Sequence, residues 1–318
     1  MGRPSTVIAV PTFRRPERLR HLLDTLARLK GIEDAMLLVA DNDDVGREGV
    51  AVAGAAAANG FPAPIAIITV PEPGLTHVRN AIVEQALRYP TMRRLAMIDD
   101  DEWPGPEWLA QLILVQRNTG AGVVAGPVEP RFVEDAPGWA MQTLVFRPEQ
   151  RREGLTDMLY AANNLLVERR ALEAIERPWF DPAFNLSGGE DMDFLTRLRV
   201  AGVTFAWAPS AVVYESVGPE RARKSWVLRR MWRIGITDIM AARKRRTGAL
   251  GRLALTARSL ALLGLRTLLL PTMAWQVERR LDIAGQWVKS AGRLYALAGG
   301  SDAIYAAAAD DGTQRSRS

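Results

Sequence analysis

Short apolar runs alternate with helix-like patterns along the first 130 residues of the chain. Runs rich in β-branched and aliphatic residues predict strands, and apolar positions at helical spacing predict the helices between them. The predicted strands are Thr6–Val10, Met36–Ala40, Ile65–Val70, Arg94–Asp99 and Val123–Gly126, and the predicted helices are Pro16–Leu29, Arg47–Ala58, Thr76–Tyr89 and Pro106–Arg117. This alternation predicts an α/β fold with a mainly parallel sheet that carries helices on both faces.

The pattern changes twice further along the chain. From residue 127 to about 218 it is broken by proline and glycine, with one clear helix at Asp191–Ala201. After residue 219 the chain is helical, basic and rich in Leu and Ala. We therefore predict one domain over 1–218, with halves of about 1–126 and 127–218, then a helical extension over 219–308 and a disordered tail over 309–318.

Charge is distributed unevenly between these parts. Residues 219–318 carry 19 Lys and Arg against 7 Asp and Glu, whereas residues 1–218 carry 22 against 29. Such a split predicts an acidic, metal-binding part and a basic part that meets an anionic partner, either nucleic acid or a membrane surface. The two longest apolar stretches of the extension, Ser259–Leu265 and Thr267–Val277, are shorter than the roughly 18–20 residues of a spanning helix. They favour a helix that lies on a membrane or against a partner.

Composition excludes several kinds of chemistry. The chain has no cysteine, which removes disulfides, thiolate metal sites and cysteine nucleophiles, and its two histidines argue against a histidine-built zinc site. The N-terminal residues run directly into a predicted strand, so we expect no signal peptide and a cytoplasmic protein.

Two acidic clusters are the main candidates for a site. In "AMIDDDEWPG", Asp99, Asp100 and Asp101 follow an apolar strand, and ligands of open α/β sheets bind at such carboxyl ends. Along an extended chain Asp99 and Asp101 share a face, and their hard oxygens suit Mg²⁺ or Mn²⁺. In "FNLSGGEDMDFLTRL", Asp191 could act as a general base delivered by the glycines. The alternatives are a solvated acidic turn and acids favoured by the helix dipole alone.

The order of the landmarks "VPTFRR", "VADND", "GLTHVRN", "IDDDE" and "GGEDMDFLTRL" resembles that of the family 2 inverting glycosyltransferases, which have the Rossmann-like GT-A fold. The resemblance covers roughly residues 6–233. It implies that the first half of the domain binds a nucleotide and the second half an acceptor.

The resemblance also implies roles for individual residues. Asp191 matches the general base, Asp99 the ribose contact and Asp101 the metal ligand of the DxD motif. The other residues expected at the nucleotide sugar are Pro11, Thr12, Arg14, Asp41 (at the uracil), Arg79 and Asp100. The acceptor and sugar pocket is expected to contain Asn163, Asn164, Gly189 and Glu190.

Three assignments stay open at this point. Asn163 and Asn164 could instead satisfy buried backbone groups. Many relatives have a metal-binding histidine where this chain has Glu215, so either Glu215 or the diphosphate with water completes the metal shell. Arg221 could neutralise the diphosphate or lie in a solvated loop. The glycines of "GAGVVAG" enter a predicted strand rather than open a helix, so we reject a dinucleotide-binding motif there.

The extension resembles that of bacterial exopolysaccharide glycosyltransferases of the succinoglycan type. This resemblance implies transfer of a hexose from a UDP-sugar, with UDP-glucose expected, to a saccharide carried on polyprenyl diphosphate. The expected cofactor is Mn²⁺ or Mg²⁺, and the expected location is peripheral, at the inner face of the cell membrane. Homo-oligomers are compatible with the extension, which could also pack on a partner subunit.

Two rival functions make different demands on the sequence. A nucleotidyltransferase of the same fold needs a glycine-rich triphosphate loop after the first strand, and "VPTFRRPERL" has no glycine. A basic nucleic-acid-binding protein would explain the extension but not the paired acidic clusters, so we expect no nucleic-acid partner.

Overall fold

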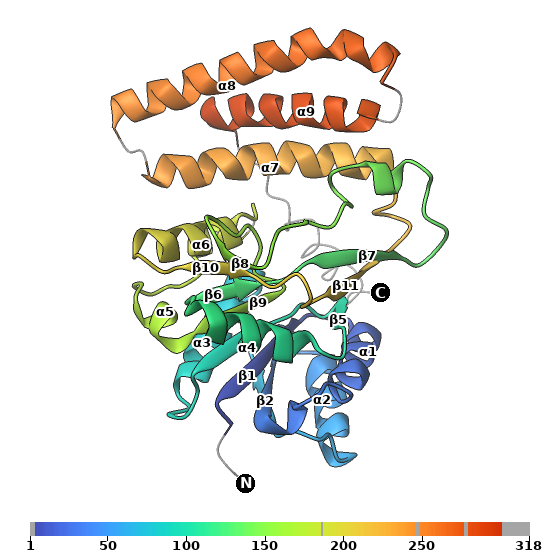
Figure 1. Ribbon diagram of the computed structural model, residues 1–318, viewed down its shortest axis with the longest axis vertical. Helices are drawn as coiled ribbons and strands as arrows, with labels where there is room; N and C mark the ends of the chain where they lie inside the picture. Colours follow the sequence, from blue (N-terminus) through green and yellow to red (C-terminus); the bar gives the residue numbers. More distant parts are fainter. Residues whose placement is uncertain (1–3, 186, 246–247, 277–278, 301–318) are drawn as a thin grey trace. The chain divides into compact units, whose positions relative to one another are not determined.

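A computed structural model describes residues 4–185, 187–245, 248–276 and 279–300 of the chain (Figure 1). The chain divides into two compact units, and each is described by itself. Unit 1 comprises Met1–Arg131, Pro148–Pro182 and Glu190–Ser216, and unit 2 comprises Phe132–Arg147, Ala183–Gly189 and Val217–Ser318. Two segments of the predicted second half, 132–147 and 183–189, thus belong to the same unit as the C-terminal helices. The predicted disordered tail, 309–318, lies outside the described residues.

Unit 1 is built on a mixed sheet. Within the described residues its eight strands have the order β3-β2-β1-β4-β9-β6-β10-β8. They are β1 Thr6–Thr12, β2 Ala35–Asp41, β3 Ile65–Thr69, β4 Arg94–Met97, β6 Val123–Ala125, β8 Gly154–Thr156, β9 Leu165–Glu168 and β10 Phe205–Trp207. The pairs β1–β2, β1–β4, β2–β3 and β6–β10 are parallel, whereas β9 runs antiparallel to β4 and β6, and β8 to β10. The five predicted strands are confirmed.

Helices cover both faces of this sheet, as predicted (Figure 1). They are α1 Pro16–Leu26, α2 Glu48–Ala58, α3 Leu75–Leu87, α4 Trp108–Thr119, α5 Arg169–Glu173 and α6 Glu190–Val200. Alternate residues of β1 face opposite sides: Val7 packs with α3 and α6 residues, and Ile8 with residues of α1, α2 and α4. The fourth predicted helix begins at Trp108 rather than Pro106.

A second sheet of unit 1 fixes the turn that carries the aspartate triplet. Its order is β5-β11-β7, with β5 Glu102–Pro104, β7 Val128–Phe132 and β11 Val213–Val217. Trp103 of β5 packs edge-on against His21 of α1 at 5.1 Å between ring centroids and beside Tyr214 of β11 at 6.0 Å. Because β4 ends at Met97, the triplet lies in a turn between β4 and β5 and not in an extended strand, which corrects the prediction.

Asn164 joins three segments of the core. Its side-chain oxygen accepts a hydrogen bond from Trp108 Nε1 at 2.8 Å, and its amide nitrogen donates to the carbonyls of Pro127 and Ala211 at 3.0 and 2.9 Å. The residue is 2% exposed, and both amide hydrogens have partners. We therefore remove Asn164 from the predicted acceptor pocket and assign it a structural role.

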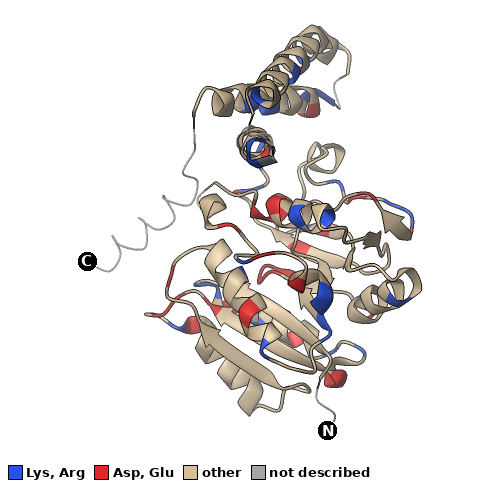
Figure 2. Cartoon of the chain, turned by 90° about the vertical axis from the view of Figure 1, so that its left-hand side faces the viewer, with Lys and Arg blue, Asp and Glu red and all other residues tan. Residues whose placement is uncertain are grey.

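Unit 2 contains three long helices: α7 Lys224–Arg245, α8 Ala249–Leu269 and α9 Arg280–Leu297. A Cβ atom added at Gly235 of α7 would lie 2.2 Å from the Lys289 carbonyl oxygen of α9, so these helices pack backbone to backbone. Asp238 of α7 pairs with Lys289 and Arg293 of α9 at 3.0 and 3.1 Å. Lys and Arg are frequent along these helices (Figure 2).

Helix α8 corrects the prediction from apolar run lengths. Among the described residues one stretch, Ala249–Ala274, is long and apolar enough to cross a membrane by length and composition. Arg266 lies inside α8, so the first apolar run and the start of the second belong to one α-helix. Helix α8 ends at Leu269, and Leu270–Ala274, which contain Pro271, form the 3-10 helix η4. The end of the second run, at Val277, lies outside the described residues. Length and composition do not distinguish a spanning helix from one lying on a surface.

Asn164→Ala should lower the free energy of unfolding by about 2–4 kcal/mol, because it leaves the Trp108 indole and two carbonyls unpaired in the core. Urea denaturation followed by tryptophan fluorescence measures this loss. Asn163→Ala is the matched control, since Asn163 is only partly buried, and it should cost less than half as much. Equal losses in the two variants would contradict the structural role of Asn164.

Candidate active site

The aspartate turn is held by residues that follow β1. Thr12 Oγ1 donates to Asp100 at 2.9 Å, and Arg15 Nη1 donates to the same carboxylate at 3.0 Å. Arg18 Nη1 lies 3.3 Å from Asp101, and Arg15 Nη1 lies 3.6 Å from it. The side chain of Asp100 is 5% exposed and that of Asp101 is 16% exposed. Asp101 is therefore the carboxylate of the pair that a ligand can reach.

Glu102 is a further acid at the centre of the cluster. It is 1% exposed, it accepts a hydrogen bond from the Asp99 backbone N–H at 3.0 Å, and it accepts another from the Asn163 amide. Glu215 of β11 stands opposite it in the strand register. Burial, the neighbouring Asp99 and then Glu215 raise the pKa of Glu102 well above its ordinary value.

Asp99 is also close to other carboxylates, but its side chain is more accessible than that of Glu102. Burial first, and then repulsion from Asp101 and Asp191, raise its pKa to about 7, although Arg79 opposes the shift. Its side chain is still 30% exposed, so a ligand can contact it. Such an accumulation of carboxylates favours a bound cation.

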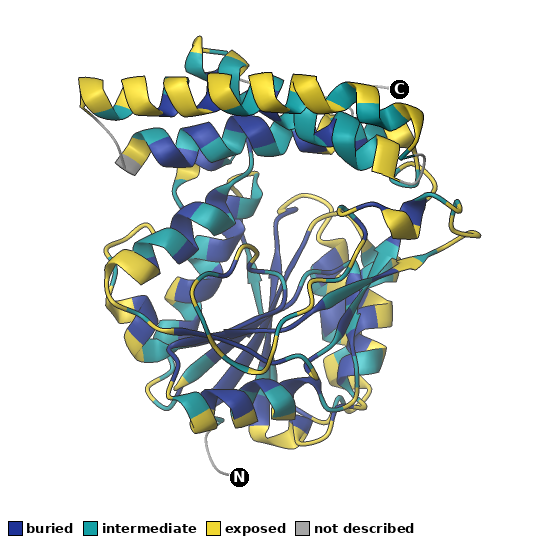
Figure 3. Cartoon of the chain, turned by 45° about the horizontal axis from the view of Figure 1, so that its top comes forward, coloured by how far each residue is buried: buried dark blue, intermediate teal, exposed yellow. Residues whose placement is uncertain are grey.

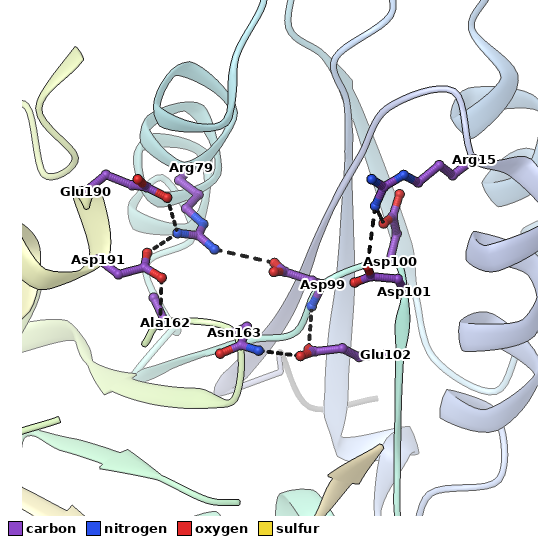
Figure 4. A network of polar contacts seen from close by, with 10 residues as sticks. All are labelled: Arg15, Arg79, Asp99, Asp100, Asp101, Glu102, Ala162, Asn163, Glu190 and Asp191. Atoms are coloured by element: carbon purple, nitrogen blue, oxygen red, sulfur yellow. Dashed lines mark hydrogen bonds and ion pairs between the residues drawn. The ribbon is translucent and has the colours of Figure 1, made fainter. Parts of the chain in front are cut away.

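Arg79 of α3 connects the two acidic clusters (Figure 4). Its Nη2 lies 3.5 Å from Asp99, its Nη1 lies 3.3 Å from Glu190, and Nη1 also pairs with Asp191 Oδ1. Asp99 and Asp191 therefore lie close together, on either side of a common partner, and their shared functional site stays a prediction.

The start of α6 positions Asp191. Helix α6 begins at Glu190, so both acids lie in its first turn, where the helix dipole favours negative charge. Asp191 Oδ2 accepts a hydrogen bond from the Ala162 backbone N–H at 3.2 Å. Gly188 and Gly189 precede the helix with φ of 73° and 98°, a region that favours glycine.

The residues predicted at the nucleotide base lie at the ends of β1 and β2, but they differ in access. Pro11 and Thr12 are buried in β1, whereas Arg14, with φ of 51°, is 44% exposed and pairs with Asp43 at 2.9 Å. Asp41 is 0% exposed, and its carboxylate accepts the backbone N–H groups of Asp43 and Val50 at 3.0 Å each. Asp41 thus orders the start of α2, and its burial argues against the predicted contact with uracil.

Two predicted site residues belong to unit 2. Gly189 packs against Thr237, and an added Cβ would lie 2.9 Å from the Thr237 Cβ. Arg221 holds its guanidinium 5.1 Å from the centre of the Trp226 ring. Neither is part of the network in Figure 4, so their predicted roles at the acceptor and the diphosphate stay predictions.

Sequence reasoning missed Glu102, Arg15 and Arg18. The continuation of the triplet into "DDDE" was visible, and so were Arg15 and Arg18 in "FRRPER". Side-chain contact between these segments, however, depends on the parallel pairing of β1 with β4.

The acids fit a divalent ion that is shared with a substrate. Among the described residues no group of three or more His, Asp or Glu is arranged to hold a metal ion alone. Mg²⁺ and Mn²⁺ sites in nucleotide enzymes need only one or two carboxylates, because phosphate oxygens and water supply the other ligands. Asp101 meets this requirement, and Glu215 is the second carboxylate that the sequence predicts there.

A mixed α/β sheet with an acidic turn after β4 and a carboxylate at the start of α6 agrees with the GT-A fold that the sequence resemblance implies. Residues 7–175 match the model of "Glycosyl transferase family 2", and residues 96–290 match that of "Glycosyl transferase family group 2". The chain is 35% identical over 238 residues to the succinoglycan biosynthesis protein ExoM of Rhizobium meliloti (strain 1021), covering 72% of each chain. The chain therefore belongs to glycosyl transferase family 2.

Solved structures show the same fold. The mannosyltransferase PcManGT from Pyrobaculum calidifontis, solved with GDP-Man and Mn²⁺, matches with a TM-score of 0.58 and 16% identity over 93% of this chain and 88% of its own. Residues 1–349 of S. aureus TarS, solved with UDP, match with a TM-score of 0.53 and 11% identity over 93% and 92%. The predicted fold class, with its helical extension, is confirmed.

Arg18→Gln should strengthen Mn²⁺ binding about 2- to 5-fold, because it removes a cation 3.3 Å from Asp101. The measurement is free Mn²⁺ by electron paramagnetic resonance during a titration without nucleotide. Arg20→Gln, on the same helix but paired with Glu17, should leave the affinity unchanged, and Asp101→Ala should abolish the binding. Weaker Mn²⁺ binding by Arg18→Gln would contradict the idea that Arg18 and Mn²⁺ compete for Asp101.

Proposed function

We propose that this enzyme transfers a hexose from a UDP-sugar, with UDP-glucose as the expected donor, to a saccharide acceptor with inversion at the anomeric carbon. The observation that carries the proposal is the Arg79 bridge, which joins the carboxylate at the start of α6 to the aspartate turn after β4. A base and a diphosphate-binding turn are the two elements that such a transfer needs. The UDP of the TarS structure and the GDP-Man and Mn²⁺ of the PcManGT structure support a sugar-nucleotide donor.

In the proposed reaction, Asp191 accepts the proton of an acceptor hydroxyl as its oxygen attacks the anomeric carbon of the donor. The new bond forms from the acceptor oxygen to this carbon while the bond from the carbon to the diphosphate oxygen breaks. The electron pair of the broken bond leaves with UDP. Attack opposite the leaving group inverts the configuration, so an α-linked donor gives a β-linked product.

The aspartate turn serves the leaving group. Asp99, 30% exposed, is available to the ribose, and Asp101 with Glu215 would hold the divalent ion. The ion, when bound, stabilises the charge that develops on the departing diphosphate as a Lewis acid. Asn163, whose amide donates a hydrogen bond to Glu102, would contact the sugar.

Nucleotidyl transfer on the same fold is disfavoured by the arginines after β1. That reaction needs a cationic loop open to a triphosphate. Here Arg14 pairs with Asp43, and Arg15 and Arg18 pair with the aspartate turn. These arginines neutralise acids of the chain itself.

We also propose that the acceptor is linked to polyprenyl diphosphate and that the enzyme acts at the inner face of the cell membrane, in synthesis of a surface or extracellular polysaccharide. The similarity to a succinoglycan biosynthesis protein supports the pathway class. The outer face of α8 supports the membrane: the leucines exposed along it are Leu250, Leu253, Leu260, Leu265, Leu268 and Leu269. A helix face in contact with water is normally polar, whereas the exposed face of α8 is rich in leucine. Arg252 and Arg258 are also exposed on this helix. Figure 3 shows the long exposed stretches of the C-terminal helices.

The inner contacts of α8 favour a helix that lies on the membrane over one that crosses it. Ser259 is buried, and Arg266 donates to the Gln286 carbonyl of α9 at 2.6 Å. Because α9 also carries Lys289 and Arg293, a helix bound along it does not enter the hydrocarbon region. Leucines with flanking arginines are the composition of an interfacial helix on anionic lipid.

Asp191→Asn should lower the rate of hexose transfer at least 10³-fold and change the Kd of UDP less than threefold, because only the proton acceptor is lost. The assay measures UDP release with a panel of UDP-sugars and with GDP-mannose, each with and without Mn²⁺, and UDP affinity is measured by calorimetry. Asp193→Asn, in the same helical turn, is the matched control and should retain most activity. Transfer by Asp191→Asn at the wild-type rate would remove Asp191 as the base.

Leu268→Glu should weaken binding to phosphatidylglycerol vesicles about tenfold or more, since it replaces an apolar contact by a charge of the wrong sign. Cosedimentation with vesicles measures the partition, and phosphatidylcholine vesicles should bind less protein. Val133→Glu, at another exposed apolar position of unit 2, should bind like the wild type. If the wild-type protein ignores anionic vesicles, the membrane assignment is wrong.

A further inference from the structure

The sequence resemblance assigns Arg79 to the nucleotide, but the structure places its side chain in a different environment. Arg79 is 2% exposed and lies on α3 among three carboxylates, from Asp99 on one side and from Glu190 and Asp191 on the other (Figure 4). Both terminal nitrogens have carboxylate partners. Only Nε lacks a hydrogen-bond partner within the described residues, and it is buried.

Burial of a guanidinium is tolerated here because of these acids. Burial opposes its charge, but Asp191, Asp99 and Glu190 outweigh that effect and raise the pKa of Arg79 above its ordinary value. A phosphate could reach the guanidinium only by displacing a carboxylate from it.

The contacts of Asp191 show what Arg79 does for the base. One carboxylate oxygen pairs with Arg79 Nη1, and the other accepts the Ala162 backbone N–H at 3.2 Å. Held at both oxygens, the carboxylate has a fixed plane, and each oxygen keeps a lone pair for a proton. A base so oriented is ready for the acceptor hydroxyl, and small misplacements of such a group are costly.

Arg79 also sets the distance between the base and the donor-side turn. A guanidinium is planar and rigid, so its Nη1 and Nη2 hold Asp191 and Asp99 at a fixed separation. The ammonium of lysine is a single point of charge and cannot span both carboxylates.

We propose that Arg79 is a positioning residue that holds the base Asp191 in register with Asp99, and that it does not contact the nucleotide. The proposal rests on the function proposed above, in which Asp191 is the base and Asp99 faces the donor. It assigns to Arg79 an effect on turnover and none on donor affinity.

The test compares Arg79→Lys and Arg79→Gln with the wild type in kcat, in the KM of the donor and in the Kd of UDP with Mn²⁺. We expect kcat to fall about 10²-fold in both variants, with KM and Kd within threefold of the wild type. Arg88→Gln, at the exposed C-terminal end of α3, is the matched control and should change none of these values. A tenfold or larger loss of UDP affinity with kcat retained would overturn the proposal, and so would a wild-type kcat in both variants.

A second measurement separates positioning from a loss of folding. Arg79→Ala leaves a cavity of the shape of the lost side chain, and added guanidinium ion should raise its kcat at least tenfold while the KM of the donor stays constant. Positioning would be contradicted if guanidinium raised kcat/KM only by lowering the KM of the donor. It would also be contradicted if guanidinium gave no rescue in a variant with a native circular dichroism spectrum and normal UDP binding. The Arg79 variants are compared only with an active wild-type enzyme. If the wild-type enzyme binds UDP but transfers no sugar to any acceptor, the proposed function is wrong, and the role of Arg79 is not what failed.

Discussion

Repulsion among buried carboxylates is the constraint on which the site depends. Asp99 and Glu102 lie close together after β4, where burial and Asp99 raise the pKa of Glu102, and Glu190 shares Arg79 with Asp191 at the start of α6. Two groups of arginines supply that positive charge: Arg79 from α3 for the base side, and the arginines after β1 for the turn. These arginines therefore offset the charge of the acids in the protein without ligands.

The pairing of strands and the packing of helices in unit 1 bring these arginines and acids together. Parallel pairing of β1 with β4 places the arginine segment beside the aspartate turn, and α3 carries Arg79 to the position where α6 begins. In the proposed reaction, the acids at the turn would serve the leaving group and the acid of α6 would serve the acceptor.

Sequence alone predicted the strands of the first half, their helices and the two acidic clusters, because periodic apolar patterns and the order of motifs depend on local chemistry. It did not decide the role of a side chain whose partners are distant in the sequence. Asn164 and Asp41 are polar residues inside motifs, and only the tertiary structure shows that they bind backbone groups and an indole. Glu102 was overlooked because its burial depends on β11. The continuity of α8 through Arg266 was missed because the packing of α9 satisfies that arginine.

The most direct test is a crystal structure of the protein with UDP and Mn²⁺. The account predicts the diphosphate and the ion beside Asp101, Arg15 and Arg18 released from that carboxylate, and Arg79 still bound to Asp191. A nucleotide bound away from the aspartate turn, or a nucleotide in contact with Arg79 after Arg79 has left Asp191, would contradict it.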